Sequence, residues 1–301
     1  MEQRAIPHVT VCVCTFRRPQ LLTKLLEELG RQETHGEFTF SAVVADDDTE
    51  RSAKAAVESC AARLTYPIEY VSEPRQNIAL ARNTALSRAN GDFVAFIDDD
   101  EYPATNWLRD LLKACYAGGA EGALGPVRPY FETEPPRWAV RGGFYERPRH
   151  ESGYRIRLSD ARTGNVLFKR SLIAGDAEVF KAEFKNGGED VDFFRRKMAA
   201  GAAFVWCDEA QVYEIVPASR STRSYLLRRA LLRGRNSLRQ KSGRVTKVVK
   251  SALATPLYLL LLPFLYLAGE HHGLKFLIKL CDHGGRLLAI AGLNPVKERD
   301  L

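Results

Sequence analysis

The stretch FVAFIDDDEYP, Phe93 to Pro103, runs from an apolar strand directly into Asp98, Asp99, Asp100 and Glu101. Side chains alternate across a strand, so Asp98 and Asp100 are expected on one side and Asp99 on the other. Like charges at this spacing raise one another's pKa, so the cluster is costly unless a cation lies between them. The stretch therefore predicts two converging carboxylates at the carboxyl end of a central strand, where open α/β sheets bind ligands.

A hard divalent cation, Mg²⁺ or Mn²⁺, suits this arrangement because it takes few protein oxygens and completes its shell with water and substrate phosphates. The alternative is an ordinary acidic turn, since aspartates often end strands and cap helices. A second acidic strand end, VVADDDT, favours a ligand site, because Asp46 could accept a hydrogen bond from a ribose hydroxyl or a base N–H. A helix cap before Glu50 would explain Asp48 or Thr49 better than Asp46.

Strands and helices alternate on both sides of this stretch, which predicts a parallel, doubly wound α/β sheet. Pro19 is placed to open the first helix, and Gly30 to end it. After residue 120 the alternation of strands and helices becomes irregular. The sequence predicts one strand at residues 121–131 and a long irregular surface segment at residues 132–162. The other predicted strands are 9–16, 40–49, 68–74, 92–100, 163–173 and 204–216, and the predicted helices are 17–32, 50–64, 77–91, 105–119 and 187–201.

A third acidic site lies in NGGEDVDFF, where Glu189 and Asp190 begin a predicted helix after two glycines. A carboxylate held beside a substrate hydroxyl could act as a general base, although acidic residues at a helix start are also ordinary partners of the helix dipole. Arg82 and Asn83 are expected to face inward from the helix after the third strand, and Arg75 lies near its start. These three could bind phosphates, position an acidic loop or simply be solvated.

The charge of the chain is unevenly distributed. Pro217 to Lys250 holds eleven Lys or Arg and no Asp or Glu, which leaves a net charge of −4 for the rest of a chain of net charge +7. Ser251 to Gly269 follows with nineteen uncharged residues, the lower limit for crossing a bilayer. Pro256 and Pro263 disfavour a straight span, so an interfacial or re-entrant hairpin is equally well supported. We expect this tail and the partly amphipathic residues 274–292 to associate with an anionic membrane, the alternative being a buried helix or a dimer surface.

Length and composition are those of a folded protein, with 301 residues of which 45% are apolar. The six cysteines form no CxxC pair, which is typical of reduced thiols in a cytosolic protein. The N-terminal sequence MEQRAIPHVTVCVCTF lacks a basic region followed by a long apolar core, so no secretory signal is expected. The catalytic part of the chain is therefore expected to remain inside the cell.

Six motifs, in this order and spacing, resemble the glycosyltransferase family 2 enzymes, which have the GT-A fold. The tail VYEIVPASRSTRSYLLRRALLRGRNSLR looks like that of the succinoglycan-biosynthesis glucosyltransferases of bacterial exopolysaccharide assembly. The resemblance covers roughly residues 8–240, and its specificity comes from six individually weak motifs in register. The motifs are VCVCTFRRPQLLTKLLEEL, VVADDDT, NIALARNTAL, FVAFIDDDEYPATNWL, TGNVLFKR and GGEDVDFFRR.

The resemblance implies a donor site for a nucleotide-sugar. Thr15, Phe16 and Arg17 would line the pocket for the base, Asp46 would contact base or ribose, and Arg82 would lie near the diphosphate or base. Relatives often carry Asn or Gly where this chain has three consecutive aspartates, which leaves open which carboxylate of this cluster touches the nucleotide.

The resemblance also implies the chemistry. Asp98 and Asp100 would form the DxD element, with Asp98 toward the ribose and Asp100 on a Mn²⁺ or Mg²⁺ ion. Asp190 would be the base that deprotonates an acceptor hydroxyl, with Glu189 supporting it or binding acceptor. The reaction would invert the anomeric centre, and the metal would neutralise charge on the leaving nucleoside diphosphate.

As a whole, the resemblance implies a GT-A domain at 1–240, with a nucleotide-binding half at 1–118 and an acceptor half at 119–240, and a membrane-associated helical segment at 241–301. The enzyme would move one sugar, from a UDP-sugar in the usual case, to a saccharide acceptor carried on a membrane lipid diphosphate during cell-surface polysaccharide assembly. The expected location is the cytoplasmic face of the inner membrane, with no nucleic-acid partner.

Two other functions remain open at this point. A sugar nucleotidyltransferase shares the sheet and a metal aspartate, but it normally opens with a glycine- and lysine-containing phosphate loop, and CTFRRPQ contains neither residue. A noncatalytic membrane or nucleic-acid adaptor would explain the basic stretch, although aromatic residues for base stacking are sparse there. Arg228, Arg229 and Arg233 only loosely resemble the arginine motif of processive synthases, so we assign them no catalytic role.

Overall fold

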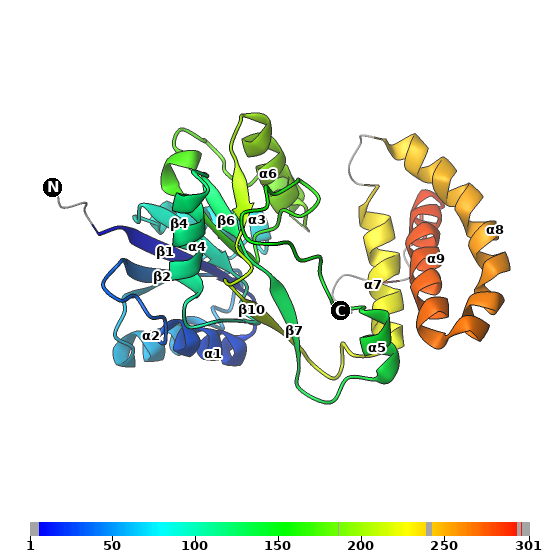
Figure 1. The fold of residues 1–301 in the computed structure, drawn as a ribbon, viewed down its shortest axis with the longest axis horizontal. Helices are drawn as coiled ribbons and strands as arrows, with labels where there is room; N and C mark the ends of the chain where they lie inside the picture. The colour runs from blue at the N-terminus through cyan, green and yellow to red at the C-terminus, as the bar shows by residue number, and fades with distance from the viewer. Residues whose placement is uncertain (1–5, 186, 239–242, 294–295, 297–301) are drawn as a thin grey trace. The chain divides into compact units, whose positions relative to one another are not determined.

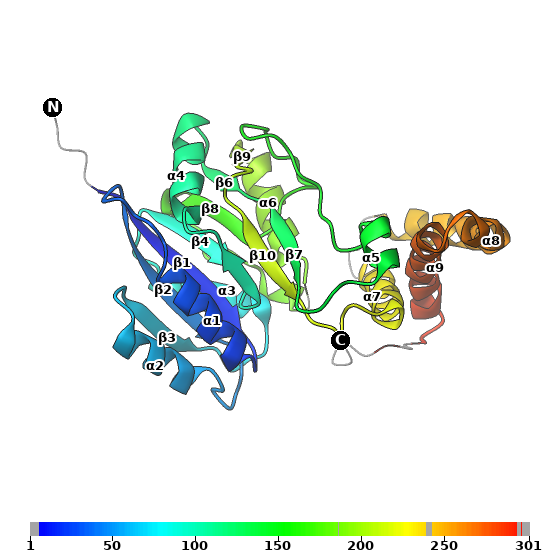
Figure 2. The same ribbon diagram turned by 60° about the horizontal axis from the view of Figure 1, so that its bottom comes forward.

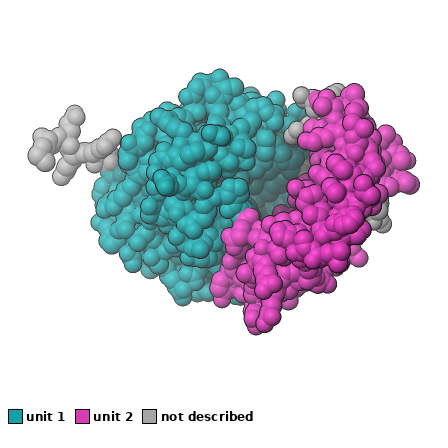
Figure 3. All heavy atoms as spheres, turned by 45° about the vertical axis from the view of Figure 1, so that its right-hand side comes forward, with its two compact units in different colours: residues 1–128, 147–214 teal, residues 129–146, 215–301 magenta. Residues whose placement is uncertain are grey.

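The computed structural model describes residues 6–185, 187–238, 243–293 and 296, and the chain divides into two compact units (Figure 3). Residues 1–128 and 147–214 make up the first unit, and residues 129–146 and 215–301 make up the second. This is a division by contacts, so the functional boundaries expected at residues 118 and 240 stay a prediction.

A seven-stranded sheet with the order β3-β2-β1-β4-β8-β6-β9 runs through the first unit (Figures 1 and 2). β1 pairs in parallel with β2 and β4, β2 with β3, and β6 with β9, whereas β8 is antiparallel to both of its neighbours. The predicted α/β fold with a mostly parallel sheet is therefore confirmed. The strands are β1 His8–Thr15, β2 Thr39–Asp46, β3 Ile68–Ser72, β4 Phe93–Ile97, β6 Gly122–Leu124, β8 Asn165–Lys169 and β9 Phe204–Trp206.

Helices cover both faces of this sheet, because the central strands are apolar on both sides. Along β1, Val9, Val11 and Val13 join the core under α1, α2 and α4, while Cys12 joins the core under α3 and α6. β4 alternates in the same way, which places its carboxyl end between two packed layers. The helices are α1 Pro19–Leu29, α2 Lys54–Arg63, α3 Ile78–Arg88, α4 Trp107–Ala117 and α6 Glu189–Ala199, with short 3₁₀ turns at Arg170–Ile173 and Ala182–Phe184.

Several local predictions were wrong. β4 ends at Ile97, so the acidic residues lie in a turn: Asp99 and Asp100 share Arg18, whereas Asp98 lies toward Arg82, and strand alternation does not pair Asp98 with Asp100. Residues 204–216 contain two strands in different sheets instead of one.

Residues 121–131 form two strands instead of one: β6 and β7 Val127–Phe131, which lies in a separate three-stranded sheet with β5 Glu101–Pro103 and β10 Val212–Val216. Gly125 and Pro126 separate these two strands. Pro126 has no N–H to donate to a β-ladder, and a Cβ at position 125 would overlap the carbonyl oxygen of Ala210. The second helix begins at Lys54, four residues later than the predicted start at Glu50.

The second unit is helical, with α5 Arg137–Gly142, α7 Arg223–Asn236, α8 Arg244–Ala268 and α9 Glu270–Ile290. α9 packs on α5, α7 and α8. Pro256 and Pro263 both lie inside α8, which continues through them. Of the described helices, α8 alone is long and apolar enough to cross a membrane, with a mean hydropathy of 1.8 over its most apolar 18 residues, of which 6% are buried.

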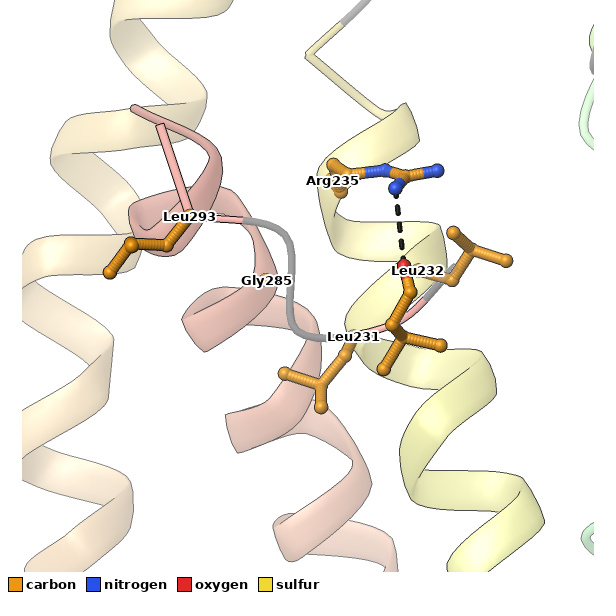
Figure 4. Close-up of a pocket in the computed structure, with 6 residues that line it drawn as sticks. Leu231, Leu232, Arg235, Gly285 and Leu293 are labelled. Atoms are coloured by element: carbon orange, nitrogen blue, oxygen red, sulfur yellow. Dashed lines mark hydrogen bonds between the residues drawn. The ribbon is translucent and has the colours of Figure 1, made fainter. Parts of the chain in front are cut away.

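A small cavity lies where α7 meets α9 (Figure 4). Its volume of about 10 Å³ is near that of one water molecule. Leucines dominate its wall, and the polar group there is satisfied, since Arg235 Nη1 donates to the carbonyl oxygen of Val296 at 3.2 Å. This cavity is therefore a packing gap and is too small for a ligand.

Candidate active site

Helix α3 carries a buried arginine that joins two of the predicted acidic sites. Arg82 Nη1 donates to Glu189 Oε1 at the start of α6, and Arg82 Nη2 lies 3.9 Å from Asp98 Oδ1 at the end of β4. The side chains of Arg82 and Glu189 are 9% and 5% exposed, whereas that of Asp98 is 52% exposed. Three residues predicted from separate motifs therefore meet at one point, where the half-exposed Asp98 remains accessible to a ligand.

The acidic loop after β4 is held by polar groups that enter from the end of β1. Thr15 Oγ1 donates to Asp99 Oδ2 at 2.8 Å. Arg18 Nη1 donates both to Asp99 Oδ1 at 3.1 Å and to Asp100 Oδ2 at 3.0 Å. Burial raises the pKa of Asp99 to about 6, although Arg18 acts in the opposite direction. The Arg18 guanidinium therefore supplies the positive charge that the crowded carboxylates need in the free protein.

Glu101 lies beneath this loop and is 1% exposed. Its Oε2 accepts from the backbone N–H of Asp98 at 2.9 Å, while Oε1 has no hydrogen-bond partner among the described residues. Burial, followed by the charge of Asp98, raises the pKa of Glu101. A Cβ on Gly164 would lie 3.0 Å from Glu101 Oε1 and 3.2 Å from Asp98 Oδ2, so only glycine lets the chain pass here without crowding both carboxylates.

Two further arginines lie near the same carboxylates. Arg147 pairs with Glu214 on β10, and both of these charges influence Asp98. Burial, together with the nearby Arg147, lowers the pKa of Arg162 to about 10. The Nε of Arg162 is buried with no partner in the part of the chain that the structure describes. Arg18, Arg147 and Arg162 were not predicted as site residues. Arg18 lies at the start of the predicted helix 17–32 and the other two lie in the irregular segment 132–162, and neither position indicates the distant carboxylates that these arginines approach.

The second acidic cluster, at the end of β2, uses most of its oxygens internally. Asp46 is fully buried, and its carboxylate accepts from the backbone N–H groups of Asp48 and Ala53 at 3.1 and 2.9 Å. Asp46 therefore holds the turn that leads into α2. Asp47 is partly exposed and accepts from the N–H of Asn77 at 2.8 Å, and burial raises its pKa to about 6. Of the three aspartates, Asp47 is the one whose placement suits ligand contact.

Two glycines in the left-handed region, Gly187 with φ 105° and Gly188 with φ 98°, bring the chain into α6. Asp190 is half-buried in the first turn of this helix, and its Oδ1 accepts from the N–H of Val191. The segment before α6 is fixed to α3, because Asn83 exchanges hydrogen bonds with both backbone groups of Phe180 at 2.7 and 2.9 Å. Asn83 therefore faces inward as expected, and its amide positions the loop.

The remaining predicted residues lie at the rim. Phe16 is 42% exposed, and the guanidinium of Arg17 stacks 5.1 Å from the centre of its ring. Arg17 Nε also pairs with Asp48 at 3.1 Å. Arg75 pairs with Glu73 at 2.6 Å and is 63% exposed, which agrees with the solvated alternative.

The carboxylates of Asp98 and Asp100 are hard oxygen donors of the kind that Mn²⁺ or Mg²⁺ accepts. No group of three or more His, Cys, Asp or Glu side chains within the described ranges is arranged to hold a metal ion. A site with two protein carboxylates agrees with this result, because Mg²⁺ usually takes one or two carboxylates and completes its shell with water and substrate phosphates. The half-exposed Asp98 and the Arg18-bound Asp100 supply two such carboxylates, and a cation held there would replace Arg18 on Asp100.

Comparisons with known proteins identify the family of the chain. The model of the family described as glycosyl transferase family 2 matches residues 10–174. The chain is 32% identical to the succinoglycan biosynthesis protein ExoM of Rhizobium meliloti (strain 1021), over 97% of this chain and 95% of that protein. It is 25% identical to the hyaluronan synthase of Pasteurella multocida over 69% of this chain, which corresponds to 24% of that longer protein.

Solved structures show the same fold at low sequence identity. The structure of S. aureus TarS 1-349 in complex with UDP aligns with a TM-score of 0.54 and 18% identity, over 96% of this chain and 93% of that one. GalNAc-T7 with UDP, GalNAc and Mn²⁺ aligns with a TM-score of 0.55 and 12% identity, over 75% of this chain and 48% of that one. The shared fold is the mixed α/β architecture described above.

Proposed function

Because the chain belongs to glycosyl transferase family 2, we propose that it is an inverting, metal-dependent enzyme that moves one sugar from a UDP-sugar to a hydroxyl of a saccharide acceptor. Family membership makes it a glycosyltransferase, which decides against the nucleotidyltransferase and adaptor alternatives. The UDP in the TarS complex supports a uridine nucleotide as the donor. The likeness to ExoM supports a role in exopolysaccharide assembly.

The observation that carries this proposal is the pair of contacts made by Arg82, to Glu189 and toward Asp98. Through Arg82 the start of α6 lies beside the acidic end of β4. A base on α6 and a donor diphosphate held at the β4 end would then be neighbours, as a displacement reaction between them requires.

In the proposed reaction, Asp190 accepts the proton of the acceptor hydroxyl while the hydroxyl oxygen forms a bond to C1 of the donor sugar. The bond from C1 to the diphosphate oxygen breaks on the opposite face, so the anomeric centre inverts. Glu189 and Arg82 hold each other in place and fix the first turn of α6. Thr15 and Arg18 orient the acidic loop.

Asp98 and Asp100 would hold the divalent cation. When bound, that cation supplies Lewis-acid stabilisation of the charge on the leaving diphosphate. Arg147 lies near enough to Asp98 to act on its pKa, and Glu101 acts on the pKa of Arg162, so both arginines are candidates for binding diphosphate oxygens or the acceptor. Phe16 and Arg17 at the rim are available for the nucleotide base.

The second unit supports an acceptor carried on a membrane lipid. α7 carries Arg223, Arg228, Arg229, Arg233 and Arg235, and α8 has the composition of a membrane helix. Basic groups next to an apolar surface suit both anionic phospholipid and a lipid diphosphate head. We therefore place the enzyme at the cytoplasmic face of the inner membrane, bound through residues 241–301, part of which lies outside the described residues.

The test is a screen of UDP-sugars for Mn²⁺-dependent thermal stabilisation, followed by transfer assays with the donor that binds. Asp190→Asn should lower transfer by about 10²–10⁴-fold, the usual contribution of a general base, and should keep the donor-induced rise in Tm. Asp100→Asn should lose the Mn²⁺-dependent part of that rise. Glu183→Gln, an exposed carboxylate just before α6, is the control and should change neither readout. Full activity in Asp190→Asn would refute the assignment of the base.

A further inference from the structure

One face of α8 is an uninterrupted apolar stripe open to solvent. The members recur every three or four residues, so they lie along a single side of the helix. All of them are at least half exposed. At 1.5 Å per residue the stripe is about 33 Å long, which is close to the thickness of a bilayer core. The stripe consists of Val245, Val249, Leu253, Leu257, Leu260, Phe264 and Leu267.

The opposite side of α8 packs against α9 through a polar network and through Tyr258, whose ring centre lies 5.4 Å from that of Phe276. Ser251 is fully buried, and its Oγ lies 2.9 Å from His283 Nδ1 and 3.4 Å from Arg286 Nη1. Arg286 Nε donates to Ser237 Oγ at 2.9 Å, just beyond the end of α7. Because this network joins α7, α8 and α9, the three helices behave as one packed group with the stripe on its outer side.

A transmembrane α8 is incompatible with this packing. α9 lies beside α8, and a span by α8 would carry the charged residues Lys275, Lys279, Asp282 and Arg286 of α9 into the hydrocarbon. α7 packs on α9 in turn and has five arginines. Charges at the centre of a bilayer are expensive even when single. Glu270 at the start of α9, which pairs with Arg223, adds one more charge.

We infer that α8 lies flat in the surface of a bilayer, with the stripe in the acyl region of one leaflet and without crossing the membrane. The occupant of this face is anionic phospholipid, because the exposed Arg244 and Lys250 flank the stripe where it begins and can reach phosphate groups while their stems lie along apolar surface. The inference rests on the membrane part of the proposed function and adds its geometry.

The depth of spin labels in the bilayer distinguishes an α8 that lies flat in the surface from an α8 that crosses the membrane. Nitroxide labels are placed at Val245→Cys, Leu257→Cys and Leu267→Cys in the full chain carrying Cys14→Ala and Cys281→Ala, bound to vesicles of phosphatidylglycerol and phosphatidylcholine. Collision rates with oxygen and with a nickel chelate should give all three labels a similar depth of about 5–10 Å. A label at position 257 close to the bilayer centre, about 15 Å deep, with shallow labels at both ends would overturn the inference.

Binding variants supply the second measurement. Leu260→Glu should weaken sedimentation with anionic vesicles at least tenfold, since a leucine contact with the acyl region is replaced by a charge. Val140→Glu on α5, which also replaces an exposed apolar residue of this unit, should bind like the parent. Equal binding by both variants, or a vesicle-free dimer that Leu260→Glu dissociates, would assign the stripe to something other than lipid.

The donor-binding assay separates this inference from the proposed function. Mn²⁺- and UDP-dependent thermal stabilisation, recorded in solution, should be the same for Leu260→Glu and for the parent. Failure of the parent to bind any UDP-sugar would count against the proposed function alone, whereas the label depths report on the geometry of α8 alone.

Discussion

Arg18 compensates the negative charge of the acidic loop in the free protein. A single nitrogen, Nη1, binds both Asp99 and Asp100 at 3.0–3.1 Å. Asp100 is also the carboxylate proposed to hold the metal, so the guanidinium and a divalent cation would compete for the same carboxylate. Binding of the metal should therefore depend on displacing Arg18.

Arg18→Gln should bind Mn²⁺ about tenfold more tightly than the parent in the absence of UDP, because a competing positive charge beside Asp100 is removed. The free Mn²⁺ concentration, followed by electron paramagnetic resonance, gives the affinity directly. Arg17→Gln is the control, since Arg17 pairs with Asp48 outside the loop. An unchanged affinity in Arg18→Gln would show that Arg18 does not compete with the metal.

The buried pair of Arg82 and Glu189 makes a second prediction at this scale. Arg82→Met should lower the free energy of unfolding by about 3–5 kcal/mol, because it leaves the carboxylate of Glu189 buried without its partner. Arg75→Gln breaks the exposed pair with Glu73 and should change the free energy of unfolding far less, because solvent screens that pair. Urea unfolding of both variants provides the comparison, and equal losses would contradict the role assigned to burial.

At the scale of elements, α7 and α9 approach so closely that their backbones touch at two glycines. A Cβ on Gly234 would overlap the carbonyl oxygen of Asp282, and a Cβ on Gly285 would overlap that of Leu231. The ion pair between Arg233 and Asp282, at 2.5 Å, lies at the same crossing. Close approach by small residues is the way in which helices pack when little apolar side-chain volume lies between them.

Gly234→Ala and Gly285→Ala should therefore each destabilise the helical unit by about 1–3 kcal/mol, the usual cost of overpacking, even though alanine favours a helix. Gly284→Ala is a matched control on the same helix, because its Cβ would meet only Leu231 Cδ2 at 3.9 Å. Gly284→Ala should be neutral or slightly stabilising. Hydrogen exchange of α7 and α9 amides would measure all three effects.

At the scale of the whole molecule, the buried carboxyls give the protein a pH dependence. Burial raises the pKa values of both Asp47 and Asp99 to about 6, from the ordinary aspartate value of 3.8. The folded protein therefore holds these protons at a pH where the unfolded chain has lost them. The stability that these two groups contribute is present below about pH 4 and is lost as the pH rises through about 6.

Asp99→Asn should reduce the pH dependence of the free energy of unfolding. Relative to the parent, the variant should gain about 1–3 kcal/mol in the free energy of unfolding between pH 4 and pH 7, since each unit of pKa shift corresponds to about 1.4 kcal/mol. Asparagine can still accept from Thr15 Oγ1, so that hydrogen bond is retained. Urea unfolding across this pH range is the measurement, and parallel curves for parent and variant would disprove the shift.

The sequence by itself determined most of the elements and the family. Apolar periodicity and the signals at Pro19 and Gly30 depend on neighbours within a few turns, so β1, α1 and β4 follow from local pattern. The acidic cluster at Asp98 and Asp100 was visible for the same reason. The order and spacing of six motifs indicated the family, which the match of the family model to residues 10–174 confirms.

Only the tertiary structure decided which residues meet. Arg82 and Glu189 are 107 positions apart, and Arg18 and Asp100 are 82 apart, so no local pattern could pair them. The antiparallel placement of β8 in the sheet and the burial of Asp46 could not be predicted from the sequence either. Both depend on how strands and turns pack together, which no short motif encodes. Contacts between distant segments depend on how the layers of the fold pack. The sequence shows the charge of a side chain but does not show which residue it pairs with.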